Sequence, residues 1–191
     1  FKIKDKEGSK YKKYDFKYNG DDFKGGFGEQ ILGNTWEGHY GQNHKQGTQI
    51  QLLPEKLKHP ILTGVKDKGF CYAGAYRSVV REGMDVIANS QPMNGMTPDS
   101  PLDSRKPPQA FAWTFHYDAK DGKKGKAFHT TQGTSEDLLD DSYRRMLVNG
   151  VYWTMGMEDS IKADSPIEFV GEYHPTTFRN GGWIRNQKPE D

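Results

Sequence analysis

Alternation of apolar and polar positions is clearest in AFAWTFHY, residues 110–117. Phe111, Trp113 and the next two alternate rings fall on one side of an extended chain, and the residues between them fall on the other. The polar stretch DAKDGKKG follows, and KAFHTTQG then resumes an extended pattern, with His129 expected on its wetter face. These segments predict an antiparallel hairpin near 110–131 with a lysine-rich tip.

The strongest helical pattern is TSEDLLDDSYRRMLVNGVYWTMGME, which follows the hairpin. Thr134 or Ser135 supplies a cap, and the acidic residues after it suit a helix N-terminus. Apolar residues from Tyr143 onward recur at spacings of three and four, which predicts a face packed on the sheet. Gly150 lies on that face, so we expect the helix to approach a strand closely there.

The remaining elements are shorter. A two-turn helix is expected within 25–34, strands at 48–53, 70–76 and 84–90, and a short helix opened by Pro60. Residues 92–108, rich in Pro, Asp, Ser and Gly, form a loop too long for an ordinary connection. This loop is either a functional excursion or a flexible flap.

Length and charge exclude several classes of protein. The 191 residues fit one domain, and 27 basic against 26 acidic residues give a net charge of +1, which favours neither nucleic acid nor a membrane surface. A single cysteine, Cys71, excludes an internal disulfide or a multi-cysteine metal cluster. No apolar run of about 18 residues is present, so no membrane span is expected.

Composition suggests three regions along the chain. Residues 1–24 form a basic and aromatic arm, 25–158 a main domain, and 159–191 an extended C-terminal tail. The chain starts at Phe1 without an initiator methionine or an apolar signal core, so we expect it to be preceded by a further N-terminal region.

Candidate chemistry concentrates in GNTWEGHYGQNHKQGT, residues 33–48, which holds His39 and His44. His39 can bind substrate or act as a general acid or base, or it can join His44 as a ligand to a divalent metal such as zinc or manganese. A structural role is the third reading, and it is favoured for His44. Trp36, Glu37 and Tyr40 stand beside these histidines as candidate substrate-binding residues.

A second candidate cluster lies where the hairpin ends and the helix begins, at Thr134, Glu136 and Asp137. Helix capping is the favoured reading of this turn, while the two carboxylates could also accept sugar hydroxyls. The familiar phosphate-binding, zinc-binding and serine-nucleophile signatures are absent from the sequence.

The segment FHTTQGTSEDLLDDSYRRMLVNGVYWTMGME resembles the C-terminal signature of the ThuA-like, or trehalose-utilisation, family. QILGNTWEGHYGQNHKQGT, HPILTGV and AFAWTFHY are similar to family segments in the same order, and GEYHPTTFRNGGW is similar to the tail of a bacterial subgroup. The resemblance runs from about residue 14 to the end, and RRMLVNGVYW is its most specific block.

The resemblance implies a flavodoxin-like fold of the class I glutamine amidotransferase type, in which a mainly parallel sheet is flanked by helices. On this basis 25–158 would be the C-terminal part of a larger domain whose N-terminal half is missing. The strand-to-helix elbow of an amidotransferase would lie in that half, so the visible residues do not predict a glutamine amidotransferase.

For function, the resemblance implies a carbohydrate-processing domain that acts on or binds trehalose-like or oxidised (3-keto) disaccharides or glycosides. His39 matches a recurrent family histidine, whereas Thr134 stands where many members have one. Two alternatives stay open, a non-catalytic glycan-binding or assembly module and a metal-dependent sugar hydrolase or isomerase. The expected partners are the missing half of the domain, a small carbohydrate and a second copy of the chain. An exported bacterial protein, periplasmic or extracellular, is the expected setting.

Overall fold

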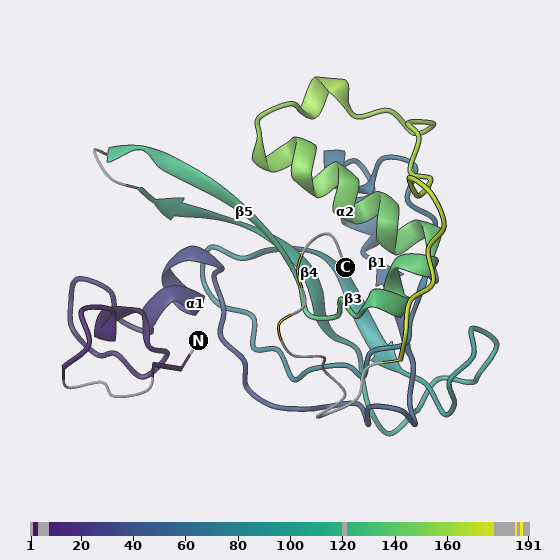
Figure 1. The fold of residues 1–191 in the computed structure, drawn as a ribbon, viewed down its shortest axis with the longest axis horizontal. Coiled ribbons are helices and arrows are strands. Elements are labelled where there is room, and N and C mark those ends of the chain that lie inside the picture. The colour runs from purple at the N-terminus through teal and green to yellow at the C-terminus, as the bar shows by residue number, and fades with distance from the viewer. Residues whose placement is uncertain (1, 4–7, 120–121, 178–185, 187, 189–191) are drawn as a thin grey trace.

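A computed structural model describes residues 2–3, 8–119, 122–177, 186 and 188 of the chain. Parts of the expected arm, hairpin tip and tail therefore lie outside the described residues. Within them, one antiparallel sheet has the strand order β2-β1-β3-β4-β5 and curls into a half-barrel (Figure 1). Its strands are β1 (Thr48–Leu52), β2 (Phe70–Cys71), β3 (Asp85–Pro92), β4 (Gln109–Asp118) and β5 (Lys124–Thr130).

The expected flavodoxin-like, mainly parallel sheet flanked by helices is wrong. Every neighbouring pair of strands in the described sheet runs antiparallel. Parallel neighbours need a long crossover, usually a helix, but the long helix of this chain follows the last strand and connects no two of them. The hairpin expected near 110–131 is present as β4 and β5, paired from Ala112↔Thr130 to Asp118↔Lys124.

Helices are few in the described part of the chain. The α-helices are α1 (Gly26–Ile31) and α2 (Asp141–Thr154). The short 3-10 helices are η1 (Lys12–Tyr14), η2 (Pro54–Lys56), η3 (Pro60–Leu62), η5 (Ser135–Leu139) and η6 (Glu158–Ser160). The helix predicted after the hairpin is thus divided into η5 and α2. The division falls at Asp140, whose carboxylate caps α2 by accepting from the Tyr143 N–H.

The core lies between α2 and one face of the sheet. Tyr143, Met146 and Trp153 of α2 are buried there against strand residues that include Ile50 and Ile87. Figure 1 shows α2 and the N-terminal segment with α1 on opposite sides of the β4–β5 hairpin. On the α1 side, the Trp113 indole Nε1 donates to the Leu32 carbonyl oxygen at 2.7 Å.

The predicted alternation along β4 breaks at Phe111. The β3–β4 register shifts between Ala88 and Asn89, which leaves Phe111 without a paired residue. A bulge of this kind turns two successive side chains toward the same face. Phe111 therefore packs against Tyr143 at a ring-centroid distance of 6.1 Å, in the core, while Trp113 faces α1.

Asp137 ties the end of β2 to the turn that follows β5. The residue is fully buried, and its Oδ1 accepts from the N–H groups of Tyr72 (2.5 Å) and Ala73 (3.1 Å). Its Oδ2 accepts from the N–H groups of Gly133 (3.0 Å) and Thr134 (2.9 Å). Burial raises the pKa of Asp137, and these hydrogen bonds act in the opposite direction because they stabilise the charged form.

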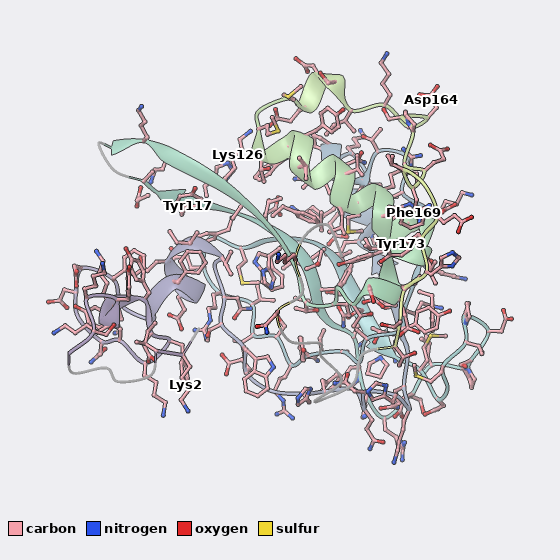
Figure 2. All side chains as sticks on the ribbon, in the orientation of Figure 1. Lys2, Tyr117, Lys126, Asp164, Phe169 and Tyr173 are labelled. Atoms are coloured by element: carbon pink, nitrogen blue, oxygen red, sulfur yellow. The ribbon has the colours of Figure 1, made fainter. Side chains whose placement is uncertain are left out.

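The described part of the tail passes along α2 and η5. Tyr173 donates its hydroxyl to the Ser135 carbonyl oxygen at 2.7 Å, and the Arg144 guanidinium lies 4.4 Å from the centre of the Phe169 ring. Figure 2 shows Phe169 and Tyr173 on the tail beside α2, and Lys126 of β5 near the other end of the helix. Lys126 donates there to the Trp153 carbonyl oxygen and pairs with Glu158.

The 92–108 loop is held in place by a polar cluster. Asp103, with 1% of its surface exposed, accepts hydrogen bonds from Arg105 and from the Gln46 amide. The hydrogen bond from the Arg105 side chain is the largest of the effects that lower the pKa of Asp103 to about 2. The bond between Asp103 and Gln46 thus ties this loop to the segment before β1. No helix in the described residues has the length and hydropathy needed to cross a membrane.

Asp137→Asn is expected to lower the free energy of unfolding by roughly 2–4 kcal/mol. The amide oxygen can replace one carboxylate oxygen, but the amide NH2 then faces two backbone N–H donors. Chemical denaturation measures the change, with exposed Asp99→Asn as the matched control. Equal stability of the two variants would contradict the structural role of Asp137.

Gly150→Ala is expected to destabilise the protein by about 1–3 kcal/mol although alanine is the better helix former. A Cβ at this position would overlap the Phe128 ring of β5, so the ring or the helix must shift. Val151→Ala, on the exposed side of α2, is the control and should leave the melting temperature nearly unchanged. A Gly150→Ala variant that melts higher than the parent would rule out the close approach.

The stability of the protein is expected to fall as the pH drops from about 6.5 to about 4. Burial lowers the pKa of His129 to about 4, so the unfolded chain binds this proton at a higher pH than the folded chain does. His59, whose pKa burial also lowers, contributes in the same direction. His129→Phe keeps a ring on Trp113 and should reduce the pH dependence by up to about 1.4 kcal/mol per pH unit. Parallel stability–pH curves for parent and variant would show that His129 has no such effect.

Candidate functional site

Three adjoining hollows form a groove that we call the Trp36 groove. The first, about 350 Å³, is lined among others by Trp36, Tyr76 and His129. The second, about 440 Å³, shares Tyr76 with the first and adds His39 and Thr134. The third, about 240 Å³, shares Thr134 with the second and ends at Glu136. The two candidate clusters of the sequence therefore meet along one groove.

The wall that carries His39 is fixed by backbone pairing. His39 and Tyr76 form an antiparallel bridge, and the N–H groups of Tyr40 and Gly41 both donate to the Ala75 carbonyl oxygen. The Arg77 N–H donates to the Gly38 carbonyl oxygen at 2.9 Å. The glycine-rich segment at 33–48, which lacks regular structure before β1, is thereby held against residues after β2.

Trp36, His39 and Tyr76 form an aromatic cluster on this wall. Ring centroids lie 5.6 Å apart for Trp36 and His39, 5.5 Å for His39 and Tyr76, and 6.5 Å for Trp36 and Tyr76. Trp36 is 60% exposed. Across the described part of the chain, the His39 imidazole makes no hydrogen bond or ion pair, so its nitrogens are available to a ligand.

The candidate carboxylates are already engaged. Glu37 pairs with Arg81 at 2.6 Å, and Arg81 also lies 3.4 Å from Glu29. Glu136 accepts from the Thr177 hydroxyl at 2.9 Å. Because the Asp137 carboxylate is buried under four backbone N–H donors, we assign it a structural role. Among the described residues that line the groove, Glu136 alone brings a carboxylate.

Tyr40 and Thr134 occupy different positions relative to the groove. The Tyr40 hydroxyl donates to the Pro107 carbonyl oxygen at 3.1 Å, so it helps to hold the 92–108 loop. Thr134 lines both the second and third hollows. It also occupies the position before η5, where its N–H donates to the Asp137 carboxylate.

His44 does not line the same hollow as His39. It lines the third hollow, whereas His39 lines the second, and its backbone is left-handed with φ of 63°. Within the residues described, no three His, Cys, Asp or Glu side chains are grouped so that they could hold a metal ion. The two histidines thus share a groove without forming the three-ligand set of a catalytic zinc site.

Several lining residues were not identified from the sequence. The His129 ring lies against the Trp113 ring, with their centroids 4.4 Å apart, and lines the first hollow. Its low pKa keeps His129 neutral at pH 7. Tyr76 and Arg77 come from the segment after β2. Their only local signal is an adjacent aromatic and basic pair in AGAYRS, and nothing in that pattern indicates which loop faces them.

Comparison with protein-family models, with curated proteins and with solved structures finds no match to this chain.

Proposed function

We propose that the Trp36 groove binds a small carbohydrate. The observation that carries the proposal is the exposed Trp36 ring beside Tyr76 and the His39 imidazole, whose nitrogens bond to no residue that the structure describes. Sugars present apolar C–H faces that pack on aromatic rings and hydroxyls that need converging polar groups, which is the usual composition of a small-molecule site. The resemblance to trehalose-utilisation proteins points to the same ligand class, although the fold that it implies is not the one observed.

Polar groups at fixed positions complement the rings. The Asn34 amide donates to the Ser78 hydroxyl at 3.1 Å and to the Val79 carbonyl oxygen at 3.0 Å. Ser78 accepts this bond, and no described residue accepts from its O–H, so the hydroxyl can donate to a ligand. Asn34 and Ser78 both line the first hollow, and Thr131 lines the first and second.

The geometry supports binding rather than glycoside hydrolysis. Most glycosidases use two carboxyl groups on either side of the scissile bond. Of the candidates here, Glu37 is neutralised by Arg81, Asp137 is buried, and Glu136 lies at the far end of the groove from Trp36. We therefore favour a glycan-binding module over a sugar hydrolase.

Trp36→Ala is expected to weaken binding of a disaccharide such as trehalose or cellobiose roughly tenfold, because the stacking surface is lost. Isothermal titration calorimetry measures the affinity, and Leu57→Ala, which removes another exposed apolar side chain, is the control. His39→Ala should also weaken binding, with an unchanged melting temperature. If the parent binds no disaccharide, or Trp36→Ala binds as the parent does, the proposal fails.

A further inference from the structure

We propose that the carbohydrate is acidic and that Arg77 binds its carboxylate at the mouth of the first hollow. This inference rests on the proposed function and adds a class of substrate to it.

The charges around the first hollow favour an anion. Arg77 and His129 are the basic side chains among its described lining residues, and no carboxylate lines it. His129 is neutral at pH 7 because burial lowers its pKa to about 4. Among the described lining residues, the Arg77 guanidinium therefore carries a positive charge that no carboxylate balances.

Arg77 differs from its neighbour Arg81 in its partners. Arg81 is compensated by Glu37 at 2.6 Å and by Glu29 at 3.4 Å. The exposed Arg77 forms no ion pair with any residue that the structure describes. Its backbone is fixed by the bond to the Gly38 carbonyl oxygen and by the bridge next to it. From this fixed backbone position the guanidinium can reach a ligand in the hollow, and its planar fork matches a carboxylate with two parallel hydrogen bonds.

The surroundings of Arg77 fit a sugar acid better than a free ion. The hollow of about 350 Å³ is far larger than an inorganic anion, and Phe27, Leu32 and Trp113 give it an apolar floor. Trp36 and Ser78 line the same hollow, so a pyranose ring can stack while a hydroxyl accepts from Ser78. A uronic acid carries the apolar ring face, the hydroxyls and the carboxylate in one residue.

Calorimetric titration of the full chain with digalacturonate, with its methyl ester and with neutral digalactose of the same linkage tests the inference. We expect the parent to bind the diuronate tightest, and salt to weaken that binding. Arg77→Gln should weaken binding of the diuronate roughly tenfold to a hundredfold and leave the two neutral ligands unchanged. Arg77→Lys should recover part of the loss, and exposed Lys58→Gln should behave as the parent does.

Equal affinity of the parent for all three ligands, or equal losses for all three in Arg77→Gln, would overturn the inference and leave the proposed function standing. Binding of none of these three ligands would overturn the inference, and if trehalose and cellobiose also fail to bind, the proposed function itself is refuted. Inorganic phosphate that competes with the diuronate at similar affinity would show a simple anion site and would also overturn the inference.

Discussion

The Asp137 carboxylate is the constraint on which the arrangement of the groove depends. Its two oxygens accept from two pairs of backbone N–H groups, one pair just after β2 and one in the turn after β5. These segments are far apart in the sequence and lie at different places in the sheet order. A buried carboxylate is costly unless it is fully hydrogen-bonded, so the two segments satisfy Asp137 only where they meet. The middle of the groove is built at this meeting point.

Local pattern predicted local structure well. The β4–β5 hairpin, the helical stretch after it and the close approach at Gly150 all follow from residue spacing, which depends on near neighbours. The direction of strand pairing does not, because β1 and β3 pair across a connection that local periodicity cannot position. The fold class expected from family resemblance alone is wrong. The bulge at Phe111 depends on how β4 pairs with β3, so the sequence of β4 alone does not predict it.

The candidate site was predicted in part. Trp36, His39, Thr134 and Glu136 were selected from two separate segments, and they line one groove. Asp137 and Tyr40 have the chemistry of ligand-binding residues but are used to hold backbone in place. The sequence alone does not mark Arg77 or His129 as groove residues, because their significance depends on their surroundings. No described carboxylate pairs with Arg77, and His129 is largely buried, and neither property can be read from adjacent residues.

Strand β5 contributes side chains both to the core under α2 and to the wall of the groove. Phe128 faces α2 at Gly150, and the next residue, His129, faces the opposite side and stacks on Trp113 in the wall of the first hollow. Successive side chains of a strand point to opposite faces, so a shift of the Phe128 backbone away from α2 would also move His129. A larger residue at Gly150 can therefore disturb the wall of the first hollow from the other side of the sheet.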